Sequence, residues 1–197
     1  MKRSIGIALV VFLFLQANAQ DHEYRTIFDA QDLRITGMGG PFMQFTTLGG
    51  EFAHMMGGGG AVLLNNFFVG GYGLGLTNMI PDYVNQNTDH TLTLGHGGFW
   101  MGYALAGNRP VHASLSTLVG WGEFGIMEFD RYYPFVRDQV FVLTPMLEVE
   151  LNLTRYFRLG IGATYNLVTM VDEGLHGYRS ADLSSPGAVL SFKFGWF

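Results

Sequence analysis

Four charged residues in the last third of the chain lie at spacings that could bring them together. Glu148 and Glu150 are two residues apart, Arg158 lies in the next apolar segment and Lys193 lies in the last one. In a strand, successive side chains point to opposite faces, so each of these residues shares a face with the other polar positions of its segment. Charges that face a closed interior must pair, because an unpaired buried charge is costly. We expect Glu148, Glu150, Arg158 and Lys193 to form a structural salt-bridge network in the lumen of a barrel, with a gated proton or ion path as the alternative.

His112 and Ser114 are a second candidate for chemistry, since a His can serve as the base for a Ser nucleophile. The two residues are two positions apart and therefore share a strand face. Alternation along this segment places that face inward, away from the apolar positions. The simplest interpretation is a pair of polar side chains that line the lumen.

The remaining residue types do not form a metal or cofactor site. Four of the other histidines show no metal-ligand spacing: His54, His90, His96 and His176. The run Gly57–Gly60 lacks the Lys and the following helix of a phosphate-binding loop, and it predicts a bend or a close approach within a strand. The chain has no Cys, which removes disulfides and thiolate metal ligands. We expect no cofactor and no metal.

The segment at the end of the sequence indicates which elements position these residues. Residues 188–197 alternate strictly, with Ser191, Lys193 and Gly195 on one face. The opposite face is apolar and largely aromatic, and it consists of Leu190, Phe192, Phe194 and Trp196. A strand of roughly 9–11 residues crosses a bilayer when tilted. We therefore predict that this closing strand turns its apolar face to lipid.

Seven further segments alternate in the same way, and polar or glycine-rich stretches separate them. They are residues 42–48, 51–64, 67–77, 91–106, 111–121, 141–153 and 157–167. The connections at 65–66, 107–110 and 154–156 are short, whereas 78–90, 122–139 and 169–186 are predicted to be long polar loops. Outer-membrane barrels keep short turns in the periplasm and long loops outside. The pattern predicts an all-β fold, an eight-stranded antiparallel up-and-down transmembrane β-barrel.

Two segments carry a more detailed prediction. In residues 67–77 we expect Phe68, Tyr72, Leu74 and Leu76 to face outward and the glycines between them to face a narrow lumen. In residues 91–106 the apolar parity changes between Leu94 and Phe99. One extra residue reverses the alternation of a strand, so this change predicts a bulge at Gly97-Gly98.

The amino-terminal region and the overall composition fit an exported protein. Residues 1–19 have a basic start, an apolar run and an Ala17-Asn18-Ala19 cleavage site, which predicts a signal peptide. Residues 20–36 are predicted to be a periplasmic leading segment and residues 37–197 the outer-membrane barrel. Without Lys2 and Arg3, nine basic residues remain against 16 acidic ones, a formal charge of −7. Such a chain lacks the basic footprint of a nucleic-acid-binding protein.

The ladder of alternating strands, the signal peptide and the aromatic carboxyl terminus resemble the small outer-membrane β-barrel proteins of the OmpA/OmpX kind. The runs at 39–53, 57–60 and 67–76 look like an uncharacterised branch of them. The resemblance implies the fold, an outer-membrane location, contact with membrane lipid and handling by the barrel assembly machinery. One departure concerns the carboxyl-terminal signal of such barrels, in which the final Phe shares a strand face with apolar residues. Here Phe197 shares its face with Gly195 and Lys193. Either Phe197 lies past the strand end, or the signal is read from Trp196.

We expect a non-enzymatic integral outer-membrane barrel that is structural or presents its extracellular loops to an unknown ligand or partner. One alternative is a lipid A-modifying enzyme, because His112-x-Ser114 resembles the His-x-Ser pair of outer-membrane lipid A deacylases. Leu115 stands where that motif has Asn, and the pair points away from lipid. The other alternative is a soluble periplasmic lipocalin-like binding protein.

Overall fold

A computed structural model of the chain describes residues 33–83, 87–128, 136–170, 172 and 177–197. The barrel lies within one unit, Arg34–Phe197. The predicted signal peptide lies outside the described residues, as does the leading segment up to residue 32.

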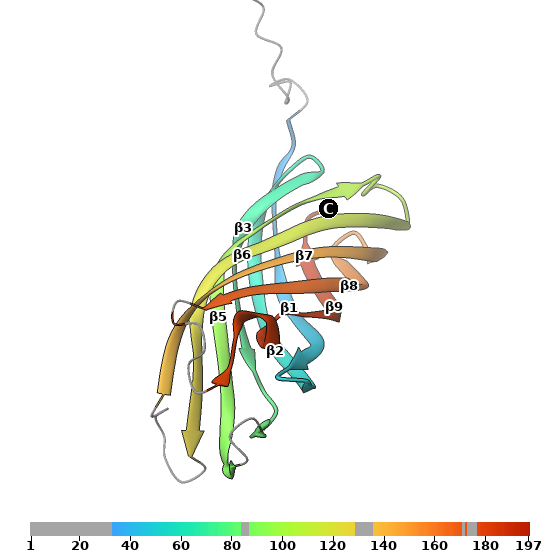
Figure 1. The fold of residues 1–197 in the computed structure, drawn as a ribbon. Coiled ribbons are helices and arrows are strands. Elements are labelled where there is room, and N and C mark those ends of the chain that lie inside the picture. The colour runs from blue at the N-terminus through green and yellow to red at the C-terminus, as the bar shows by residue number, and fades with distance from the viewer. Residues whose placement is uncertain (1–32, 84–86, 129–135, 171, 173–176) are drawn as a thin grey trace, which may run out of the picture. The chain divides into compact units, whose positions relative to one another are not determined.

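Long antiparallel strands make up most of this unit (Figure 1). They are β1 (Ile35–Leu48), β2 (Glu51–Leu64), β3 (Phe67–Leu76), the two-residue β4 (Pro81–Asp82), β5 (Asn87–Leu105), β6 (Val111–Glu128), β7 (Val136–Thr154), β8 (Phe157–Met170) and β9 (Ser185–Gly195). One helical turn, α2 (Ser180–Leu183), lies between β8 and β9. β1 pairs with β9, and β3 pairs with β5 rather than with β4. Within the described residues, this closes a ring of eight strands and confirms the predicted antiparallel barrel.

The two ends of the ring differ in their connections. The turn end carries the tight turns at 65–66, 106–110 and 155–156, together with Phe197. The loop end carries the Gly49-Gly50 turn, β4 and α2. Both glycines of that turn have positive φ angles of 60° and 87°, which glycine adopts at little steric cost. No helix among the described residues is long and apolar enough to span a bilayer.

The first strand begins earlier than the sequence pattern indicated. β1 starts at Ile35, so the cluster Gly37–Pro41 lies inside the strand instead of ahead of it. Its glycines pair with the glycine run of β2, for example Gly40 with Gly59. Pro41 has no N–H, and the ladder to β9 has no paired residue at Pro41. The proline thus interrupts one ladder without ending the strand.

The orientation expected for β3 is wrong. Phe68, Tyr72 and Leu74 are 3–8% exposed and point into the lumen, while Gly71 and Gly73 lie on the outer face. The aromatic residues of β3 fill the lumen together with Trp100 from β5, whose ring centroid lies 5.1 Å from that of Phe68. Burial of these rings inside the barrel replaces the glycine-lined lumen that the pattern predicted.

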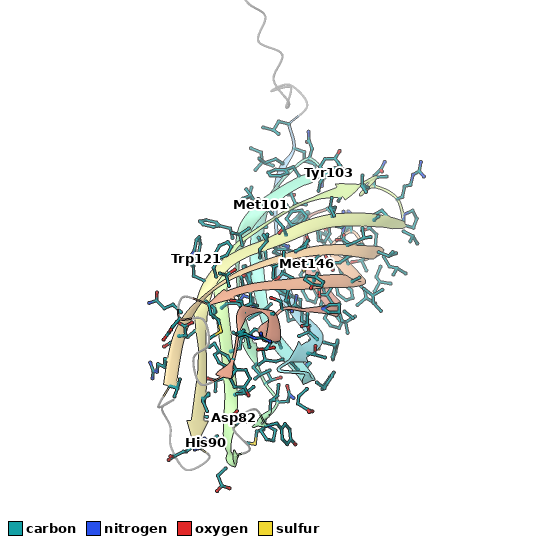
Figure 2. The ribbon with its side chains drawn as sticks, in the orientation of Figure 1. Asp82, His90, Met101, Tyr103, Trp121 and Met146 are labelled. Carbon is teal, nitrogen blue, oxygen red and sulfur yellow. The ribbon has the colours of Figure 1, made fainter. Side chains whose placement is uncertain are left out.

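The bulge expected at Gly97-Gly98 is absent, because β5 pairs with β3 and with β6 through this region without a shift of register. Instead, Leu92 and Leu94 point into the lumen, whereas Phe99 and Tyr103 point outward. The apolar residues of β5 switch from the outward to the inward face because the lumen itself becomes apolar towards the loop end. Figure 2 shows Tyr103 and Trp121 on the outside of the barrel wall.

The strands at the loop end also extend into segments predicted as loops. β6 continues to Glu128, and β7 begins at Val136. Phe124 and Ile126 of this extension are almost completely buried in the lumen, while Glu123 is exposed. Charged residues on the outer face made this stretch look like a loop, but buried and exposed residues alternate along it as a strand requires.

We predict that Gly57→Ala destabilises the barrel, whereas Gly73→Ala does not. A Cβ at Gly57 would collide with the main-chain oxygen of Gly73, whereas a Cβ at Gly73 meets no atom within 4 Å. Overpacking of this kind costs about 1–3 kcal/mol. Urea unfolding of the refolded proteins in detergent, followed by tryptophan fluorescence, measures the difference. Equal midpoints for the two variants would contradict the close packing of β2 on β3.

Candidate functional site

The largest group of buried charges lies in the lumen near the turn end. β7 points Glu148 and Glu150 inward, β8 contributes Arg158, and β9 contributes Lys193. The register between neighbouring strands sets their heights, because Arg158 lies opposite Lys193 and Glu148 lies opposite Gly162. All four side chains are buried, and we call this group the lumen charge cluster.

Lys193 holds the lumen charge cluster together. Its Nζ lies 2.8 Å from Glu148 Oε2 and 2.6 Å from Glu150 Oε1. The same nitrogen lies 5.4 Å from the ring centroid of Trp100, close enough for a cation–π interaction. The lysine therefore neutralises two carboxylates on one side and contacts the aromatic filling of the lumen on the other.

Each carboxylate of the cluster has further donors. Ser191 Oγ donates to Glu148 Oε1 at 2.5 Å. Glu150 Oε2 lies 3.6 Å from Arg158 Nη1 and 3.0 Å from His112 Nε2. With two carboxylates, one lysine and one arginine, the cluster is electrically neutral when His112 is neutral. Paired charges of this kind are tolerated in a low-dielectric interior, whereas single ones are not.

Arg158 closes the lumen charge cluster towards the turn end. Its Nη2 donates to the main-chain oxygen of Gly107 at 3.0 Å, and its guanidinium carbon lies 3.7 Å from the ring centroid of Phe197. Phe197 follows the end of β9 at Gly195 and covers this arginine. Two interpretations of the carboxyl terminus were open, and the structure places Phe197 past the strand end.

The apolar face of the closing strand is on the outside of the barrel. Phe194 and Trp196 are 53% and 62% exposed, and Leu190 and Phe192 lie on the same face. Phe157 of β8 stacks on Phe194 with ring centroids 4.8 Å apart. Trp196 contacts Tyr156 edge to face at 4.7 Å. An aromatic group thus lies on the outer rim at the turn end, beside β8 and β9.

His112 and Ser114 are not hydrogen-bonded to each other in the described part of the chain. Both are buried and point into the lumen, and His112 Nε2 contacts Glu150 rather than Ser114. Within the described residues, neither His112 Nδ1 nor Ser114 Oγ has a hydrogen-bond partner. A serine nucleophile needs its base within hydrogen-bonding distance and needs access to substrate. Side-chain alternation alone did not place His112 in the lumen charge cluster, because its partner follows only from the register of β6 against β7.

The other described histidines also lie apart from the lumen charge cluster and from one another. His96 is buried in the lumen, with its Nδ1 2.9 Å from Tyr72 Oη, and His54 lies on the outer face beside Thr77. His90 lies at the loop end, 3.9 Å from Glu128 (Figure 2). His176 lies outside the described residues. Across the described ranges, no three His, Asp or Glu side chains group as metal ligands.

A second site that the sequence did not reveal closes the lumen at the loop end. Tyr178 is buried against Phe124 with ring centroids 5.3 Å apart, and its hydroxyl donates to Asp82 Oδ1 at 2.8 Å. Leu183 of α2 is buried in the same apolar group. Residues 177–184 of the connection between β8 and β9 therefore fold inward as a cap, which composition alone did not distinguish from a solvated loop.

We predict that Lys193→Met lowers the free energy of unfolding by about 3–5 kcal/mol, because it leaves buried carboxylates without their main partner. The double variant Glu148→Gln/Lys193→Met should recover part of this loss. The matched control is Arg137→Gln, which breaks an exposed pair with Glu123 and should cost no more than about 1 kcal/mol. Urea titration of the folded protein in detergent measures all three. A loss for Lys193→Met as small as that for Arg137→Gln would show that the lumen charge cluster is not what stabilises this end.

Comparisons with known proteins agree with this geometry at the level of fold. No protein-family model matches the chain. A search of the curated proteins also finds no match. Among solved structures, Neisserial surface protein A (NspA) aligns over 83% of this chain and 97% of its own, with a TM-score of 0.57 and 12% sequence identity.

Two structures of Ail, the attachment invasion locus protein of Yersinia pestis, align with TM-scores of 0.50. One covers 82% of this chain and 97% of its own at 10% identity. The other, in complex with the heparin analogue sucrose octasulfate, covers 83% and 98% at 11% identity. The chain therefore has the fold of the small eight-stranded barrel proteins of the OmpA/OmpX-like class.

Proposed function

We propose that the chain is a non-enzymatic integral outer-membrane barrel that presents its loop end to a ligand or partner outside the cell. The observation that carries the proposal is the distribution of polarity across the barrel wall. Between the two ends of the barrel, charged side chains lie in the lumen, whereas the outer face is apolar. From Phe141 to Leu153, for example, every outward position of β7 is uncharged and all but Pro145 are large apolar residues.

The outer face exposes a belt of large apolar side chains on many strands. Members that are about half exposed include Phe99, Tyr103, Leu115, Trp121, Leu147, Ile161 and Phe194. Monomeric soluble proteins rarely expose apolar patches of more than a few hundred Å². A belt of this kind fits lipid, and the lumen is filled by side chains rather than shaped to hold a lipocalin-type ligand. These features support the membrane barrel over the soluble binding protein.

The orientation follows from the connections. Outer-membrane barrels keep short turns in the periplasm, so the turn end faces the periplasm and the loop end faces outward. Trp196 and Tyr156 then lie at the periplasmic membrane–water interface of the outer membrane, where aromatic residues are enriched. The wall faces lipid and the lumen is packed, so the loop end is the surface left for an external partner.

We predict that the expressed protein fractionates with the outer membrane and migrates differently on gels before and after heating. A closed barrel resists unfolding by detergent at room temperature, so unheated samples should run as a separate folded band. Recovery of the protein in the detergent-free soluble fraction would instead support the lipocalin-like alternative. Lipid A acylation that changes in cells expressing the protein, and returns to normal with His112→Ala, would support the enzymatic alternative.

The charge of the loop end indicates which partners it favours. Within the described residues, this end carries eight acidic side chains, namely Glu51, Asp82, Asp89, Glu123, Glu128, Asp138, Asp172 and Asp182. The described basic residues there are Arg137 and Arg179. An acidic surface repels a sulfated polyanion such as the heparin analogue bound to Ail. We infer that the external partner of this chain is cationic or uncharged.

Accordingly, cells that express the protein should bind no more labelled heparin than cells carrying the empty vector. Intact cells are the right system because they expose the loop end and hide the turn end. Binding above the control that disappears at high salt would contradict the inference. A parallel incubation with labelled polylysine serves as the opposite arm, in which binding should rise.

A further inference from the structure

An exposed apolar patch lies at the loop end, where the connection between β3 and β5 passes the start of β2. Its members are Phe52, Met79 and Tyr83, which are 60%, 73% and 55% exposed, and we call them the loop-end patch. Exposed apolar side chains that gather in one place mark binding surfaces more often than single ones do. The patch is therefore a candidate for the surface that an external partner contacts.

Hydrogen bonds hold the loop-end patch in one arrangement. The side chain of Asn78 donates to the main-chain oxygen of Phe52 at 2.9 Å and accepts from the N–H of His54 at 2.7 Å. These bonds fix the position of the adjacent Met79. Ile80, the next residue, is buried in the apolar group of the lumen. A surface that is ordered before binding loses little conformational entropy when a partner docks.

The part of the loop-end patch beside β4 lies beyond the lipid-facing wall. The outward face of β6 is uncharged as far as Trp121, and the next outward residue, Glu123, is charged and exposed. Thr91 of β5 pairs with Met127 of β6 on one side and with Pro81 of β4 on the other. Met127 lies further towards the loop end than Glu123. Contact with lipid therefore does not account for the exposed apolar residues on either side of β4.

The surroundings of the loop-end patch are acidic. From residue 35 to residue 108 the chain contains no Lys and no Arg. The acidic residues of this stretch are Glu51, Asp82 and Asp89, and all of them lie at the loop end (Figure 2 labels Asp82). Glu51 and Asp89 are exposed, and Glu51 directly precedes Phe52. Asp89 belongs to the part of β5 that pairs with β4.

The arginines elsewhere at the described loop end do not offset this charge. Arg137 Nη1 lies 3.3 Å from Glu123 Oε1, and Arg179 Nε lies 3.6 Å from Asp182 Oδ2. Each arginine is thus paired with an acid of its own. The loop-end patch consequently combines an apolar surface with a surplus of negative charge.

We propose that the loop-end patch binds a basic, amphipathic peptide segment of an external partner. The apolar side chains of such a segment cover Phe52, Met79 and Tyr83, while its Lys and Arg side chains face Glu51 and Asp89. A cationic polymer without apolar groups would use the acids alone, whereas an amphipathic basic segment uses both features. The inference rests on the proposed function, since an external partner reaches the patch only if the loop end faces outward.

The test uses the folded protein in nanodiscs of phosphatidylcholine, a lipid without net charge, and follows the fluorescence anisotropy of a labelled synthetic peptide made of Leu and Lys. Empty nanodiscs measure binding to the lipid, which is subtracted. A second peptide has Ser in place of Leu, and a third has Glu in place of Lys. We expect the Leu–Lys peptide to bind most tightly and to bind less tightly as salt is raised. No binding above that of empty nanodiscs, or equal binding by either of the other peptides, overturns the proposal.

Two variants and one control connect the signal to the loop-end patch. Phe52→Ser/Met79→Ser removes two of its apolar side chains and should weaken binding by about tenfold or more. Glu51→Gln removes only a charge and should weaken binding by up to about fivefold, which keeps the test valid if the double variant does not fold. Leu153→Ser removes a comparably exposed apolar residue, 54% exposed, at the turn end and should bind as the wild type does. Equal binding by the wild type and the folded patch variants, or an equal loss with Leu153→Ser, overturns the proposal.

The peptide assay and cell fractionation fail independently of each other. A chain that resides in the outer membrane, and whose patch variants bind the peptide as the wild type does, would keep the proposed function and lose this inference. A chain recovered in the soluble fraction would lose the proposed function whatever the peptide assay shows.

Discussion

The ladder between β3 and β5, which runs from Phe67 opposite Tyr103 to Gly75 opposite Gly95, closes the sheet into a ring. Without this ladder, β3 and β5 would each present an edge of unpaired main-chain N–H and C=O groups. Each such group costs several kcal/mol within a bilayer. Closure also separates an interior from an exterior. Every other feature of the barrel follows from that separation, because it gives the two faces of each strand different surroundings.

The interior is filled in two ways. Towards the loop end the lumen is apolar, and Phe124 and Ile126 lie there under the cap formed by residues 177–184, which include Tyr178. Towards the turn end it is polar, and Lys193 binds two carboxylates there while it contacts Trp100. Lys193 therefore lies where the two kinds of filling meet. An interior of this width holds side chains rather than an open channel.

The two ends of the barrel carry opposite surpluses of charge. Arg34, Arg109 and Arg155 are exposed at the turn end, whereas acidic residues dominate the described part of the loop end. In the proposed membrane location, a wall that faces lipid and a packed lumen leave these two ends for contact with other molecules. Electrostatic complementarity selects partners and steers their approach, so each end would favour ligands of the opposite charge.

The sequence by itself determined which residues share a strand face, because side-chain alternation is a local property of an extended chain. That was enough to predict eight antiparallel strands and to group Glu148, Glu150, Arg158 and Lys193 on polar faces. It also separated the apolar face of β6, with Leu115 and Trp121, from the face that bears His112 and Ser114.

Only the tertiary structure decided what each face meets. Phe68, Tyr72 and Leu74 form a face that looked suited to lipid, yet closure of the sheet turns it towards Trp100 in the lumen. The contact of His112 with Glu150 depends on the register between two strands, which a long connection does not specify. Pairing with the glycines of β2 made Gly37–Pro41 part of β1, and the rings that fill the lumen removed the need for a bulge in β5. Alternation states which side chains lie together, but pairing between distant segments determines whether lipid, water or other side chains surround them.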